Sequence, residues 1–140
     1  MLPVLRNATL GLLLLVLLVL SGCQFAQSGF AKTAGNAGGA FAAASTTLSY
    51  AHEGKLTFAY ARSSFVNYQD ELGGLDQELA TQPGAPDQRT MQQLLTLYRS
   101  AMQVIDQPCL DTGCDWRAQV LLLNKASGAF LKAQAEAGGQ

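Results

Sequence analysis

The sequence predicts an all-α protein, a small antiparallel bundle of three or four helices. From Phe41 onward, apolar residues recur at steps of three and four, which is the spacing of one face of an α-helix. No segment combines a strict alternation of apolar and polar residues with a high content of β-branched types, so strands are not expected. The 140 residues suffice for one domain with a modest core.

The first 22 residues are laid out as a signal peptide. Arg6 and the α-amino group give the start of the chain a positive charge, and a nearly unbroken apolar run of 11 residues follows at 10–20. At about 1.5 Å per residue this run spans roughly 16 Å, about half of a ~30 Å hydrocarbon core. Its length therefore favours the apolar part of a signal peptide. A short membrane anchor that is never cleaved is the alternative.

The apolar run ends in the motif Leu20-Ser21-Gly22-Cys23. This motif resembles the lipobox of bacterial lipoproteins, in which a leucine and two small residues precede a cysteine. In that family the cysteine thiol takes a diacylglycerol group, the signal peptide is cleaved, and the cysteine becomes the N-terminus. The resemblance implies a signal peptide over 1–22 and lipidation of Cys23. An ordinary secreted protein in which Cys23 is incidental is the alternative.

The same resemblance implies a place in the bacterial cell envelope. Lipid on Cys23 would hold the chain to a membrane, facing the periplasm or the cell exterior, because two or more acyl chains give lasting attachment. Gln24 follows the cysteine, and by resemblance this favours the outer membrane where a cell has two.

Assigning Cys23 to lipid leaves Cys109 and Cys114 as an even pair, which in an oxidising compartment predicts a structural disulfide. Turn-forming residues lie between the two cysteines at 111–113. A zinc site would need further ligands, and His52 is the only histidine of the chain. A thioredoxin-like pair has two intervening residues, whereas this pair has four. We therefore expect no metal, with a free or regulatory thiol pair as the alternative.

The mature chain is predicted to start with a flexible tether over 23–39, because this stretch is rich in Gly, Ala, Gln and Ser. Phe30 and Ala34 keep helical spacing with Phe41, so a partial helix there is the alternative. The helical domain is expected to cover 40–137.

A single amphipathic pattern extends from Phe41 to Leu79. It indicates either one long helix or helices that break near Gly54 or near Gly73-Gly74. The residues of this pattern are Phe41, Ala44, Leu48, Ala51, Phe58, Ala61, Phe65, Tyr68, Leu72, Leu75 and Leu79.

Two further helices follow a loop that contains two prolines. Asp87 is placed to cap the first, which ends before Pro108, and Asp115 is placed to cap the second. The tight link through Cys114 predicts an antiparallel pair packed on the longer helix. The apolar positions are Met91, Leu94, Leu95, Tyr98, Ala101, Met102 and Ile105, then Trp116, Val120, Leu123, Ser127 and Phe130.

Catalytic patterns are incomplete in this sequence. His52-Glu53 begins like the zinc motif H-E-x-x-H, but Leu56 stands where the second histidine belongs, so His52 is predicted to be a surface residue on a polar helix flank. No G-x-S-x-G motif is present. We therefore expect no enzymatic activity and no cofactor.

The remaining features favour a binding or accessory role beside an envelope protein partner. A net charge of −1 excludes a strongly basic nucleic-acid binder. Tyr50 and Tyr60 lie off the main apolar pattern and are the predicted contact residues for a partner. The alternatives are a ligand-binding or sensor bundle with a pocket between its helices, and a small envelope hydrolase built around His52.

Overall fold

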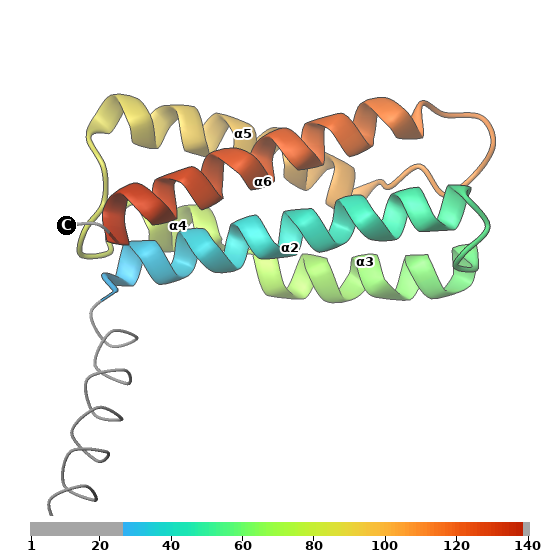
Figure 1. Ribbon diagram of the computed structural model, residues 1–140, viewed down its shortest axis with the longest axis horizontal. Helices are drawn as coiled ribbons and strands as arrows, with labels where there is room; N and C mark the ends of the chain where they lie inside the picture. The colour runs from blue at the N-terminus through green and yellow to red at the C-terminus, as the bar shows by residue number, and fades with distance from the viewer. Residues whose placement is uncertain (1–26, 139–140) are drawn as a thin grey trace, which may run out of the picture.

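The computed structural model describes residues 27–138 and confirms the all-α prediction, with five helices and no strand in that range. The four long helices run up, down, up and down, so that neighbours are antiparallel (Figure 1). The predicted signal peptide, the lipobox and Cys23 lie outside the described residues. The helices are α2 (Gly29–His52), α3 (Phe58–Leu72), the short α4 (Leu75–Leu79), α5 (Gln88–Asp106) and α6 (Trp116–Gly138).

The core lies along the axis between the four long helices. Phe41 of α2 is at its centre, with ring centroids 5.9 Å from Phe130 of α6 and 6.3 Å from Tyr98 of α5. The Tyr98 hydroxyl donates a hydrogen bond of 2.5 Å to the carbonyl of Leu72, the last residue of α3. Burial raises the pKa of this phenol, so Tyr98 stays a neutral donor that satisfies a carbonyl at the end of α3.

The flexible tether predicted over 23–39 is wrong from Gly29 onward, because those residues form the first half of α2. The Ser28 hydroxyl accepts the amide of Ala31 at 3.1 Å and caps the helix, and the amide of Phe30 donates to Pro83 at 3.1 Å. The Phe30 side chain is fully buried. A composition of Gly, Ala and Ser resembles a linker, but here those small residues pack against another helix.

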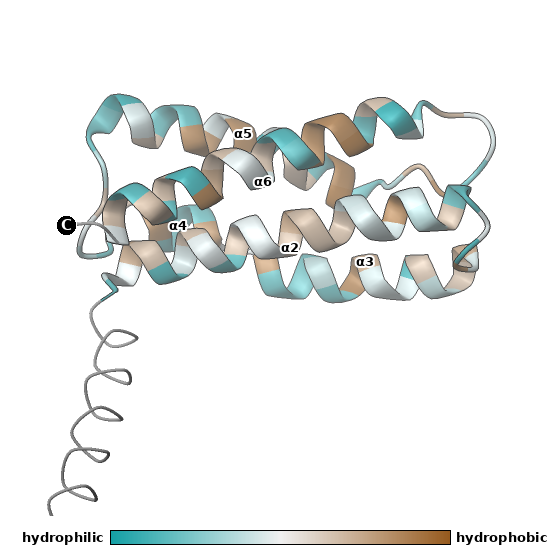
Figure 2. Cartoon of the chain, viewed as in Figure 1, coloured by the Kyte–Doolittle hydropathy of each residue, from teal (hydrophilic) through white to brown (hydrophobic). Residues whose placement is uncertain are grey.

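Small residues let α2 lie against α6 with little space between the two backbones. The hydroxyl of Ser127 on α6 donates to the carbonyl of Gly38 on α2 at 2.8 Å. A Cβ atom on Gly38 would lie 2.7 Å from Cγ of Leu131, closer than real contacts allow. In Figure 2, α2 shows mostly intermediate hydropathy, and the more strongly hydrophobic turns lie in α5 and α6. Close approach through small residues therefore buries this helix together with its large side chains Phe30, Phe41 and Leu48.

Both candidate breaks in the long amphipathic pattern are present, so a single continuous helix is wrong and the bundle has four long helices. α2 ends at His52 before Gly54, and α3 ends at Leu72 before Gly74. These two glycines have φ values of +76° and +81°, a left-handed conformation that glycine adopts without the strain of a side chain.

The predicted helix caps are confirmed. Oδ1 of Asp87 accepts the amide of Thr90 at 2.8 Å, and Oδ1 of Asp115 accepts the amide of Ala118 at 3.1 Å. The amide hydrogen bond lowers the pKa of the Asp87 carboxyl, since it stabilises the charged form. Among residues 27–138, none of the helices combines the length and apolarity that crossing a membrane requires.

Replacing Gly38 or its neighbour Gly39 with alanine, one at a time, distinguishes the effect of close packing on stability from the effect of helix propensity. Gly38→Ala is expected to lower the free energy of unfolding by about 1–2 kcal/mol, because its methyl group collides with Leu131. Gly39→Ala is expected to raise it by up to about 1 kcal/mol, since nothing lies within 4 Å of a Cβ there. Urea unfolding of the two variants measures the difference, and changes of the same sign would contradict the close contact.

Candidate functional site

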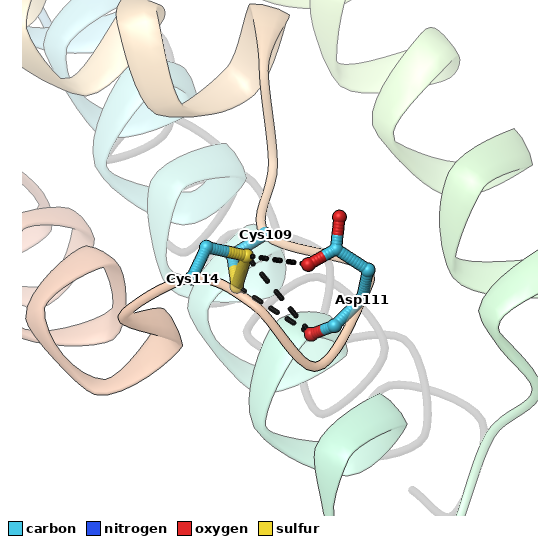
Figure 3. A group of neighbouring side chains, drawn as sticks. All are labelled: Cys109, Asp111 and Cys114. Atoms are coloured by element: carbon cyan, nitrogen blue, oxygen red, sulfur yellow. Dashed lines mark hydrogen bonds between the residues drawn. A yellow bond between two sulfur atoms is a disulfide. The ribbon is translucent and has the colours of Figure 1, made fainter.

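Two connections meet at one end of the bundle, the α2–α3 turn over 53–57 and the α5–α6 loop over 107–115 (Figure 1). We call this the disulfide end. Cys109 and Cys114 are joined there, with an S–S distance of 1.96 Å and a Cα–Cα distance of 5.7 Å (Figure 3). The cysteine pair predicted from the sequence is therefore a disulfide in the structure.

The disulfide loop brings one carboxylate close to the two sulfur atoms. Oδ1 of Asp111 accepts the amide of Gly113 at 2.9 Å and lies 3.2 Å from Sγ of Cys114 (Figure 3). Donor atoms of Cys109, Asp111 and Cys114 lie within 4.8 Å of one another, a spacing that a metal site would also use. In the disulfide neither sulfur is a thiolate, so this group offers a metal only its carboxylate.

His52 is not the surface residue that the sequence predicts. It is half-buried, and its ring stacks on Trp116 with centroids 4.7 Å apart and planes at 4°. The edge of Phe58 covers it from another direction at 5.3 Å. Nε2 lies 2.6 Å from the carbonyl oxygen of Cys109, and because a carbonyl only accepts, Nε2 carries the hydrogen. The sequence pattern missed this contact because His52, the last residue of α2, meets Trp116, the first residue of α6, and the two are far apart in the chain.

Both the backbone amide and the backbone carbonyl of Cys109 form hydrogen bonds with side chains of neighbouring helices. Oε1 of Gln119 on α6 accepts its amide at 2.7 Å, while His52 on α2 donates to its carbonyl. Nε2 of Gln119 also donates to the carbonyl of Gln107 at 3.2 Å. Sequence reasoning missed Gln119 because a single glutamine on a helix carries no pattern. The loop is therefore fixed to two helices as well as by its disulfide.

The two predicted contact residues lie at the disulfide end, on either side of the α2–α3 turn. Tyr50 is 41% exposed and Tyr60 is 61% exposed. Nζ of Lys55 lies 4.8 Å from the centre of the Tyr50 ring and 2.9 Å from Oε2 of Glu53. The hydrogen bond to the Glu53 carboxylate raises the pKa of the Lys55 ammonium group. The disulfide end thus presents two exposed tyrosines, with the Lys55 cation beside Tyr50.

A groove along the flank between α5 and α6 is a second surface feature. Its outer part has a volume of about 600 Å³ and opens to solvent. A deeper part of about 350 Å³ shares Gln93 and Leu97 with it, so the two form one groove, the α5–α6 groove. Arg89 and Lys125 line its outer part. The sequence did not indicate it, because isolated cations on helices resemble ordinary solvated residues.

No protein-family model, curated protein or solved structure matches this chain.

Opening the disulfide is expected to destabilise the domain by about 2 kcal/mol in the chain-entropy model, because the bond closes a short loop. The exposed Cys114 is the position to replace, since Cys114→Ser leaves the buried packing of Cys109 in place. In a Cys23→Ser background, thiol titration of the denatured, unreduced protein should detect no free thiol. One or two free thiols per chain would contradict the bond.

His52→Ala is expected to lower the free energy of unfolding by about 1–3 kcal/mol, since it removes one hydrogen bond and one ring stack. Trp116 is the only tryptophan, so its fluorescence reports on this contact directly. The emission should shift to longer wavelength as water reaches the ring. His52→Phe is the matched control, which keeps a ring against Trp116 but leaves the Cys109 carbonyl without its donor. Unchanged emission in His52→Ala would contradict the stacked arrangement.

Proposed function

We propose that the protein is a bacterial envelope lipoprotein, held to a membrane by lipid on Cys23, with a non-enzymatic binding or accessory role. The observation that carries the proposal is the lipobox motif directly after an apolar run of 11 residues. The chain has three cysteines, and Cys109 and Cys114 pair with each other. Lipidation gives the remaining cysteine, Cys23, a role.

The start of α2 supports a short connection to the membrane. Five residues, 24–28, separate Cys23 from Gly29, the first residue of α2. An extended chain spans at most about 3.5 Å per residue, so the start of α2 would lie within about 20 Å of the lipidated residue. The domain would therefore stay close to the membrane surface instead of moving on a long tether.

The length of α2 then gives the distance between the tethered end of the bundle and the disulfide end. Its 24 residues rise about 1.5 Å each, so the disulfide end lies about 36 Å from the start of the helix. With lipid on Cys23, Tyr50 and Tyr60 would be presented at the far end of a rigid bundle. Exposed tyrosines combine apolar area with a hydroxyl group and are common in protein interfaces.

The surroundings of His52 favour a structural role for its ring over a catalytic one. A hydrolase built around His52 would need a ring nitrogen to take a proton from a nucleophile. In this structure Nε2 donates to the backbone carbonyl of Cys109, and the ring contacts Trp116 and Phe58. These contacts give the ring a structural task at the disulfide end.

Replacing Cys23 with serine tests the lipid anchor. In a bacterial host, the unaltered chain should appear in the membrane fraction, and mass spectrometry should find an acylated N-terminal peptide that begins at Cys23. Cys23→Ser should lose both the membrane association and the acylated peptide, since a thioether to lipid requires the sulfur. Cys114→Ser is the matched control and should stay with the membrane. An unmodified Cys23 in the membrane fraction would overturn the proposed anchor.

A further inference from the structure

The α5–α6 groove exists because the helices do not pack equally closely around the bundle. α6 makes most of its contacts with α2, where Gly38 allows close approach, and far fewer with α5. The seam between α5 and α6 is therefore open on its outer side. Two adjoining parts of the groove, of about 600 Å³ and about 350 Å³, lie in this seam and share Gln93 and Leu97.

The floor of the groove is apolar. Leu94 and Leu97 come from α5, and Ala129 and Ala133 come from α6. Leu94 and Ala133 also belong to the hydrophobic core, so the floor is the outer surface of that core. An apolar side chain placed in the groove would continue the packing of the bundle outward.

The upper rim of the groove is cationic. Arg89 and Lys125 are both exposed, and neither has an acidic partner within 4.0 Å in the part of the chain that the structure describes. Lys132 and Glu136 both line the deeper part, 3.9 Å apart, so their charges offset each other and the net positive charge comes from Arg89 and Lys125. After residue 22 the chain has 8 basic and 10 acidic residues, a net charge of −2. The rim thus carries charge opposite to that of the domain as a whole.

We propose that the α5–α6 groove binds an acidic amphipathic helix of a partner protein. Its apolar stripe would lie on Leu94, Leu97, Ala129 and Ala133, and Asp or Glu side chains on its flanks would reach Arg89 and Lys125. This inference specifies the partner for the proposed binding role, and it does not depend on the lipid anchor.

The shape of the groove favours a helix over a small molecule. Small-molecule sites usually enclose most of their ligand, whereas this groove is open to solvent. From Arg89 to Leu97 its α5 edge covers about 12 Å at ~1.5 Å per residue, or roughly two helical turns. A helix laid in such a groove uses apolar anchors three and four residues apart. Charge complementarity at the rim would then orient it and favour acidic partners.

A pair of synthetic helices tests the proposal with the full-length protein in detergent. The first is a roughly 15-residue amphipathic peptide with leucines at i, i+3, i+4 and i+7 and Glu on both flanks, and its twin has Lys in place of Glu. Fluorescence anisotropy should show the acidic peptide binding at least about 10-fold more tightly than the basic twin. Equal binding of both peptides, or binding of neither, overturns the proposal.

Charge-reversal variants test whether the acidic peptide binds at the rim of the α5–α6 groove. Arg89→Glu with Lys125→Glu should weaken acidic-peptide binding about 10-fold or more. Arg62→Glu with Arg99→Glu makes the same change in net charge at exposed cations that do not line the groove, and it should leave binding unchanged. If the double reversal disturbs folding, Lys125→Gln serves instead, with a smaller loss expected. Equal effects of the two charge reversals overturn the proposal.

A third arm separates a partner helix from a lipid surface. Vesicles of phosphatidylglycerol and phosphatidylcholine are tested, with detergent-free Cys23→Ser protein, for binding that depends on Arg89 and Lys125. Vesicle binding with that dependence assigns the groove to anionic lipid and overturns the partner helix. Repeating the peptide measurements with Cys23→Ser should give the same affinities, so failure of the lipid anchor and failure of the groove are distinguishable.

Discussion

At Gly38 the backbone of α2 lies directly against Leu131 of α6, because Gly38 has no side chain of its own to separate the two helices. The hydroxyl of Ser127 donates to the Gly38 carbonyl across the interface, so a buried polar group is satisfied at the point of closest approach. Because α2 is rich in Ala, Gly, Ser and Thr, it has few large side chains with which to bury area. Dense packing of small residues supplies contact beside the buried Phe30, Phe41 and Leu48.

The same contact determines both surfaces that we assign to binding. Antiparallel packing of α2 on α6 brings the last turn of α2 beside the first turn of α6, where His52 stacks on Trp116 and holds the disulfide loop. On the opposite flank, α6 leaves an open seam with α5, whose floor is the outer surface of the core. One end of the bundle is therefore rigid and aromatic, and one side is grooved and cationic.

These two surfaces suit different tasks within one proposed role. A chain tethered at Cys23 would place the start of α2 near the membrane and the disulfide end about 36 Å away, by the rise of an α-helix. Tyr50 and Tyr60 would meet a partner at that far end, whereas the α5–α6 groove runs along the side of the bundle. An accessory protein with both could contact two elements of an envelope assembly at once.

The sequence by itself determined the helical class, the ends of the last two long helices and the pairing of the cysteines. These features depend on short-range chemistry, namely the period of apolar residues, the capping of amides by Asp87 and Asp115, and an even count of thiols once Cys23 is set aside. It also placed Tyr50 and Tyr60 off the apolar pattern, and both are exposed.

The structural roles of the small residues in α2 and of His52 follow only from the tertiary structure. Residues 29–39 have the composition of a linker, and only the presence of α6 alongside makes the lack of a side chain at Gly35 and Gly38 favourable in a helix. His52 and Gln119 bind the same loop residue from two helices, and Arg89 and Lys125 share a groove, although each pair is distant in sequence. Local patterns carry no information on such pairs, because the contacts exist only after the helices have packed.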